Sequence, residues 1–197
     1  NLGGAGPGNG TEPVRRYGSV LIKDAHEVDL VVSVQEGTEY LTADNSAEYQ
    51  GTWEQFGQIN VRDASTASLA FEFRDAATDE PVALDRFYLT VFDIDQQRTL
   101  FRHREKLCVD DDQFDEFVVH ETSNLEIENQ ATKCDGSAGT STTFLSTTAG
   151  FECDNPTDPQ DLGTIVCDEC NQCVDQGFED FFPINQGEQA VMFVFRR

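Results

Sequence analysis

The sequence predicts an all-β fold, an antiparallel β-sandwich of the jelly-roll or Greek-key type with one long loop stapled by disulfides. Three observations predict it. Apolar residues alternate with polar ones along several short stretches, Gly, Asn, Asp and Pro separate these stretches, and no stretch shows three clean turns of helical periodicity. About nine strands joined by turns are typical of a two-layer antiparallel fold.

Four stretches give the clearest strand signal. Their same-face apolar residues are Val28, Leu30, Val32 and Val34; Leu69, Phe71 and Phe73; Phe87, Leu89 and Val91; and Val191, Phe193 and Phe195. Weaker signals lie at 56–61, 117–120, 125–127 and 142–146. The last stretch, AVMFVF, is apolar on both sides, which is typical of a central strand. A strand donated to a neighbouring subunit would carry the same pattern.

We expect a flexible Gly-rich leader at residues 1–16 and a single domain at 17–197. Residues 153–188 carry four of the six cysteines and form a Cys-rich excursion before the last strand. Asn9 begins an Asn-Gly-Thr triplet, so the leader holds a candidate glycosylation site.

Acidic residues dominate the charge, with 37 Asp plus Glu against 13 Lys plus Arg and a formal net charge of −24. This charge excludes nucleic acid and anionic membranes as expected partners, because both need a basic surface. No apolar run approaches the roughly 20 residues of a membrane-spanning helix, so no membrane insertion is expected. Bound divalent cations or a salty medium would relieve the charge repulsion, whereas the acidity would otherwise serve solubility alone.

The even number of cysteines predicts disulfides and an oxidising, secreted or cell-surface location. The six are Cys108, Cys134, Cys153, Cys167, Cys170 and Cys173. A four-thiolate zinc site built from the last four is the alternative, and it would leave the first two without a role. The connectivity cannot be read, since six cysteines permit 15 pairings.

The stretch FYLTVFDIDQQ ends an apolar strand with Asp93 and Asp95. If the strand continues, both carboxylates project to one side, where they repel each other unless a cation lies between them. Calcium is the expected cofactor, because it takes six to eight oxygen ligands. Glu105 and Asp154 are the further ligands that we assign, and Asp110, Asp111, Asp112 and Asp158 are additional candidates. The alternative is a solvated strand end.

Catalysis is not expected. The sequence has no Gly-x-Ser-x-Gly motif, no P-loop and no dinucleotide fingerprint, and with so many carboxylates the spacing of any pair is uninformative. Trp53, the sole tryptophan, lies in the expected loop YQGTWEQFG. It would stack on a sugar if exposed and would belong to the core if buried.

Several phrases together carry a resemblance: NLGGAGP, FGQINV, LDRFYLTVFDID and FECDNPTDPQDLG. The chain resembles a jelly-roll-like domain of large extracellular and surface proteins of marine algae and aquatic protists. It is also loosely similar to lectin-like modules of bacterial surface adhesins. The resemblance implies a non-catalytic module for adhesion or assembly.

We therefore expect a secreted structural or adhesive module that assembles with itself or with other extracellular proteins and is stabilised by calcium. The alternative is a calcium-dependent, lectin-like module, for which glycans would be the partners.

Overall fold

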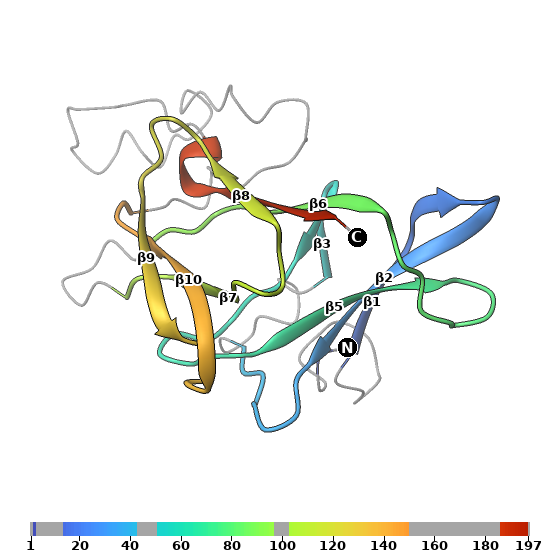
Figure 1. The fold of residues 1–197 in the computed structure, drawn as a ribbon, viewed down its shortest axis with the longest axis horizontal. Coiled ribbons are helices and arrows are strands. Elements are labelled where there is room, and N and C mark those ends of the chain that lie inside the picture. The colour runs from blue at the N-terminus through green and yellow to red at the C-terminus, as the bar shows by residue number, and fades with distance from the viewer. Residues whose placement is uncertain (1, 3–13, 43–50, 97–102, 150–185, 197) are drawn as a thin grey trace. The chain divides into compact units, whose positions relative to one another are not determined.

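The computed structural model describes residues 2, 14–42, 51–96, 103–149 and 186–196 (Figure 1). This part of the chain contains eleven strands and one short 3-10 helix, η4 (Gln186–Gln189). The strands are β1 (Val14–Lys23), β2 (His26–Val34), β3 (Gly51–Trp53), β4 (Phe56–Gln58), β5 (Leu69–Asp75), β6 (Arg86–Val91), β7 (Lys106–Asp110), β8 (Glu116–Val119), β9 (Leu125–Thr132), β10 (Ala138–Ser146) and β11 (Val191–Arg196).

All pairings between these strands are antiparallel, which confirms the all-β, antiparallel part of the prediction. The sandwich or jelly-roll arrangement stays a prediction. In the described part of the chain, no helix is long and apolar enough to cross a membrane.

The chain divides into two compact units, residues 1–84 (unit 1) and 85–197 (unit 2). Among the described residues, the buried apolar side chains likewise form two clusters, one in each unit. The described residues thus form two hydrophobic cores, and the single domain expected for 17–197 stays a prediction.

Unit 1 contains a three-stranded sheet in the order β1-β2-β5. A two-residue turn joins β1 to β2, and both of its residues, Asp24 and Ala25, have positive φ angles of 50° and 67°. Such angles match the right-handed twist of a hairpin. Val28 and Val32 on one face of β2 are fully buried, and Asp29 and Val31 on the other face are buried as well, so this central strand is covered on both sides.

The unit 1 core contains Leu2, Val32 and Tyr40. Leu2 is buried, and its N–H donates to Val14 O over 3.2 Å. Leu2 thus packs in the core and β1 begins at Val14, while the flexible leader expected at 1–16 stays a prediction, since residues 3–13 lie outside the described part.

The expected loop YQGTWEQFG contains a small hairpin, β3–β4, whose turn includes Glu54 with φ 49°. Gly57 allows β4 to approach β1, since a Cβ at this position would lie 2.9 Å from the Tyr17 ring. Gly51 does the same for β3, because a Cβ there would lie 2.7 Å from Arg15 Nη2. The two glycines thus permit close packing of this hairpin on β1.

Unit 2 contains two three-stranded sheets, β7-β10-β9 and β6-β11-β8. The last strand, β11, pairs with β6 on one side and β8 on the other, which confirms its predicted central place. Its register sets Val191 opposite Val91 and Phe195 opposite Phe87, so the apolar faces predicted from the alternation coincide. β11 is thus paired within its own chain.

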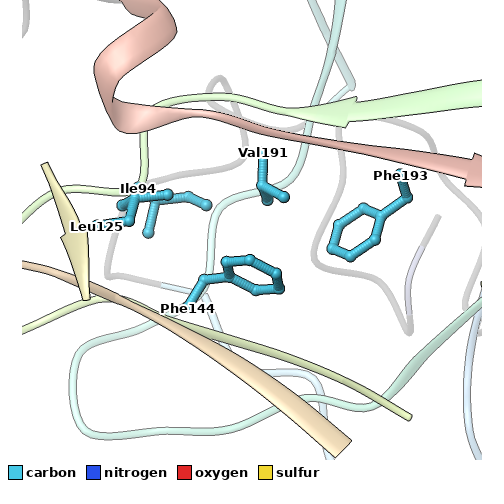
Figure 2. Packing of buried hydrophobic residues seen from close by; sticks show 5 residues of the cluster. All are labelled: Ile94, Leu125, Phe144, Val191 and Phe193. Carbon is cyan, nitrogen blue, oxygen red and sulfur yellow. The ribbon is translucent and has the colours of Figure 1, made fainter. Parts of the chain in front are cut away.

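Residues from both sheets of unit 2 meet in one core (Figure 2). Phe144 of β10 is fully buried and makes edge-to-face contacts with Phe117 and Phe193, with ring centroids 5.0 and 5.5 Å apart. Such pairs are stabilising beyond the area they bury. Leu125 and Val191 complete the contact between the sheets.

Candidate functional site

The two aspartates of FYLTVFDIDQQ lie in a segment that leaves the sheet. β6 ends at Val91, and Asp93 has a φ of 62°, in the left-handed region. The strand does not continue, so the condition under which Asp93 and Asp95 would project together is not met. Ile94 between them is 3 % exposed and belongs to the unit 2 core.

Ile94 and Gln96 bind two segments that are distant in the chain, and we call residues Ile94 to Gln96 the strap. The Ile94 N–H donates to Gln189 O over 3.0 Å, and the Gln96 N–H donates to Thr148 O over 3.0 Å. Gln189 Nε2 also donates to Thr148 Oγ1 over 3.1 Å. Since Thr148 and Gln189 flank residues 150–185, the strap fastens both flanks of the expected excursion at one place.

Glu188 adds a second fastening on the C-terminal side. Its carboxylate accepts hydrogen bonds from Thr122 Oγ1 over 2.6 Å and from Asn124 Nδ2 over 3.0 Å. Its carbonyl accepts one from the Asn124 N–H over 2.8 Å. η4 is thereby tied to the loop between β8 and β9 immediately before β11 begins.

The backbones of two of the four expected calcium ligands, Glu105 and Asp95, are hydrogen-bonded to each other. The Glu105 N–H donates to Asp95 O over 2.9 Å, and Asp93 is two residues away. Asp154 lies outside the described residues. Among the residues that the structure describes, no group of three or more His, Cys, Asp or Glu side chains is arranged to hold a metal ion. The calcium site at Asp93, Asp95, Glu105 and Asp154 stays a prediction.

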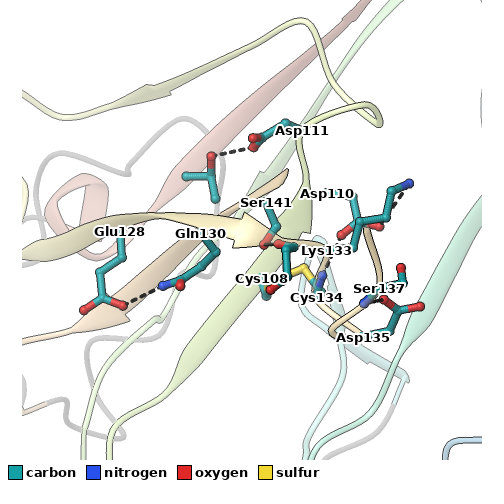
Figure 3. Close-up of a disulfide and its surroundings, with 12 residues drawn as sticks. Cys108, Asp110, Asp111, Glu128, Gln130, Lys133, Cys134, Asp135, Ser137 and Ser141 are labelled. Carbon is teal, nitrogen blue, oxygen red and sulfur yellow. Dashed lines mark hydrogen bonds and ion pairs between the residues drawn. A yellow bond between two sulfur atoms is a disulfide. The ribbon is translucent and has the colours of Figure 1, made fainter. Parts of the chain in front are cut away.

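Cys108 of β7 and Cys134 of the turn between β9 and β10 form a disulfide (Figure 3). Their Cα atoms are 5.8 Å apart, within the usual range for a bridge. The bridge joins an edge strand to the far end of the hairpin and confirms the predicted disulfide chemistry for these two residues. The other four cysteines, Cys153, Cys167, Cys170 and Cys173, lie outside the described residues.

Two of the additional calcium candidates, Asp110 and Asp112, accept hydrogen bonds from the turn that carries Cys134. The Cys134 N–H donates to Asp110 Oδ1 over 2.8 Å, and Lys133 Nζ donates to Asp112 Oδ2 over 2.5 Å. The Lys133 ammonium lowers the pKa of Asp112 below its usual value, and Asp112 raises the pKa of Lys133. Asp110 and Asp112 therefore hold this turn against β7 and its following loop.

The alternate residues of β6, β11 and β8 form the side of this sheet that faces away from the unit 2 core, which we call the outer face. Its residues are Arg86, Tyr88, Thr90, Glu116, Val118, Met192, Val194 and Arg196. Tyr88 and Val118 are 51 % and 48 % exposed, so the two edge strands of the sheet present apolar side chains to solvent.

Two arginines stand opposite each other at one end of the outer face. Arg86 of β6 pairs with Arg196 of β11 in the strand register. The Arg86 guanidinium lies over the Tyr88 ring, 4.9 Å from its centroid, and Arg196 Nη2 donates to Glu116 Oε1. This end of the outer face therefore carries two of the chain's 13 Lys and Arg residues together with one glutamate.

A network of charges covers one face of the unit 1 sheet and was not expected from the sequence. Asp29, 6 % exposed, accepts hydrogen bonds from Arg16 Nη1 and from the Ser19 N–H, each over 2.8 Å. Arg16 Nη2 also donates to Asp79, whose other carboxylate oxygen accepts a hydrogen bond from Arg74 Nη1 over 3.2 Å. These bonds lower the pKa values of Asp29 and Asp79, with Arg16 the largest cause for both.

His26 and Asp75 form a second polar pair at the end of the same sheet. His26 Nδ1 lies 3.0 Å from Asp75 Oδ2, and Asp75 Oδ1 accepts the N–H groups of Thr78 and Ala77. These backbone bonds lower the pKa of Asp75. The pair borders an open depression whose lining residues are Ala25, His26, Glu27, Asp75, Ala76 and Ala77. None of these lining residues carries a hydroxyl or thiol that the imidazole could activate.

Two expected sites cannot be placed. Asn9 lies outside the described residues. The backbone of Trp53 ends β3, directly opposite Phe56 in the hairpin, but its side chain lies outside the described part. Sugar stacking by Trp53 and glycosylation of Asn9 stay predictions.

No protein family model matches the chain, and no match was found among curated proteins or solved structures. The resemblance to extracellular algal, protist and adhesin domains therefore stays a prediction, as does everything it implies.

Proposed function

We propose that this chain is a non-catalytic structural or adhesive module of the extracellular environment, which assembles with copies of itself or with other extracellular proteins. The proposal includes a sandwich-like packing of the two sheets of unit 2 and a disulfide framework. It also includes calcium as the ion that reduces repulsion between the acidic surfaces.

The placement of exposed apolar side chains carries the proposal. Every large apolar residue that is exposed within a described strand of the three larger sheets lies on an edge strand, and none lies on the central strands β2, β10 or β11. These residues are Val20 and Ile22 in β1, Phe71 in β5, Tyr88 in β6, Val118 in β8 and Ile127 in β9.

An edge strand leaves N–H and C=O groups available to another chain, and proteins that avoid association commonly place charges there. At two of these edges the exposed side chains are apolar instead: Ile22, which is 74 % exposed, and Tyr88. Apolar side chains beside such backbone groups favour strand pairing or sheet packing with a partner.

Charge supports the calcium part of the proposal. A net charge of −24 opposes the approach of two copies, and the repulsion acts over a Debye length of about 8 Å at physiological ionic strength. A divalent cation shared between carboxylates would lower this repulsion, and extracellular calcium modules bind in the range of about 0.1–1 mM.

Sedimentation velocity tests both parts. The protein is measured over a concentration series with calcium, with EGTA, and with magnesium at equal ionic strength. We expect the weight-average sedimentation coefficient to rise with concentration, and to rise more in calcium than in magnesium. A monomer under all conditions would refute self-assembly, and identical behaviour in calcium and magnesium would refute a specific calcium role.

A further inference from the structure

We infer that the outer face of the β6-β11-β8 sheet is the contact surface for a second copy of this chain, and that its two arginines bind acidic side chains of that copy. The inference rests on the proposed self-assembly and names the surface that performs it.

The first observation is the arrangement of like charges. Arg86 and Arg196 stand directly opposite each other on neighbouring strands, an arrangement that destabilises a sheet unless an anion lies nearby. Glu116 neutralises Arg196 within the chain. Arg86 makes no ion pair with any residue that the structure describes, and its described contact is with the Tyr88 ring.

The second observation is the apolar surface beside this charge. Tyr88 and Val118 are exposed at the two edges of the sheet, whereas Val194 between them in the central strand is buried, at 2 % exposed. A guanidinium above an exposed aromatic ring, next to aliphatic side chains, is the composition that interface centres favour.

Charge complementarity selects the occupant. With 37 acidic residues against 13 basic ones, the remaining surface of another copy is acidic and fits a face that holds two arginines. Guanidinium groups bind carboxylates through two parallel hydrogen bonds, which gives the contact a defined geometry. The arginine face of one copy and an acidic face of the next form a head-to-tail contact, and such contacts extend into chains unless the rotation closes a ring.

The size of the face sets the expected strength. Three strands of 6, 6 and 4 residues, spaced about 4.8 Å apart, cover roughly 250 Å². Stable complexes bury about 800 Å² on each partner. We therefore expect a weak contact that is populated at high protein concentration.

A pair of charge reversals tests the inference at equal net charge. Arg86→Glu reverses a charge on the outer face, and Arg62→Glu makes the same change at an exposed residue of unit 1. Both variants are first compared with the unaltered chain by thermal melting. Sedimentation velocity should then show self-association weakened at least tenfold by Arg86→Glu and little changed by Arg62→Glu. Arg86→Lys, which keeps the charge but loses the planar fork, should fall between the two.

Each result has a separate meaning. If the unaltered chain associates and the two reversals weaken it equally, the outer face is not the contact, while the proposed self-assembly stands. If the unaltered chain is monomeric at every concentration, self-assembly and this inference both fail. Binding of dextran sulfate that only Arg86→Glu abolishes would overturn the second copy as occupant and assign the face to an acidic polysaccharide.

Discussion

Gln189 Nε2 donates a hydrogen bond to Thr148 Oγ1 over 3.1 Å, and this contact joins two residues that flank positions 150–185. Backbone N–H groups of the strap hold the same two residues, from Ile94 to Gln189 O and from Gln96 to Thr148 O. The flanks of the Cys-rich excursion therefore lie together at one end of the unit 2 core, independently of what lies between them.

The first prediction is that unit 2 folds without residues 150–185. A Gly-Ser linker of about six residues spans up to about 20 Å, more than the side-by-side flanks at Thr148 and Gln189 require. The shortened chain should keep its β-type circular dichroism and a cooperative melt. An additional Gln189→Ala change, which removes the contact between the flanks, should lower the melting temperature further. Loss of cooperative melting in the shortened chain alone would contradict this prediction.

The second prediction concerns the disulfide. Cys108 and Cys134 are 26 residues apart, and closing a loop of that length stabilises by roughly 3–4 kcal/mol in the chain-entropy account. Replacing both by serine should lower the urea midpoint accordingly. Proteolytic mapping without reduction should recover one peptide pair joined through these two cysteines. An unchanged midpoint would mean that the bridge stabilises nothing measurable.

The third prediction is a pH dependence from Asp29. Its folded-state pKa is lowered, chiefly by the hydrogen bond from Arg16, so its contribution to stability is present above the usual aspartate value of about 3.9. That contribution is lost as the pH falls below this value through the lowered pKa. Asp29→Asn should therefore lower the melting temperature at pH 7 and change it little near pH 2. Asp85→Asn, at an exposed residue, is the control for the loss of one negative charge.

The fourth prediction concerns the turn between β1 and β2. Ala25 has a φ of 67°, a conformation that disfavours side chains with a Cβ atom. Ala25→Gly produces an Asp-Gly turn, the sequence that such hairpins prefer, and should stabilise by about 1 kcal/mol. Ala83→Gly is the control, because Ala83 is not among the positive-φ residues, and it should give no gain. The melting temperatures of both variants, compared with that of the unaltered chain, test this prediction.

The fifth prediction concerns the unit 2 core. Phe144 is fully buried between Phe117 and Phe193, so Phe144→Ala should cost roughly 3–5 kcal/mol in unfolding free energy. Phe71→Ala removes the same ring at a half-exposed edge position and should cost much less. Equal losses in chemical denaturation would show that the two sheets do not rely on this contact.

Strands were predictable where apolar and polar residues alternate along the chain without interruption. The strands β2, β5, β6 and β11 follow directly from that alternation, although Phe71 on the predicted apolar face of β5 is 43 % exposed. β1 was not anticipated because its register shifts between Tyr17 and Leu21, and the bulge breaks the alternation. β7 is short and includes Cys108, which the pattern assigned to disulfide chemistry alone.

The candidate sites were less predictable, because their members come together only in the folded chain. Arg16 meets Asp79 across 63 positions, and Arg86 meets Arg196 through the pairing of β6 with β11. Short-range patterns carry no information on such pairings. The spacing of Asp93 and Asp95 suggested a common direction, which the positive φ of Asp93 removes.

The sequence by itself determined the β class and the apolar residues of the strongest strands, and it favoured a central place for β11 and disulfide chemistry for cysteine. Each of these follows from the local alternation of apolar and polar residues or from the composition, and neither depends on contacts between distant parts of the chain. Only the tertiary structure decided that Cys108 pairs with Cys134, that Ile94 and Gln96 fasten Thr148 to Gln189, and that two arginines share one face. These relationships depend on long-range strand register, and register is set by the packing of the whole core.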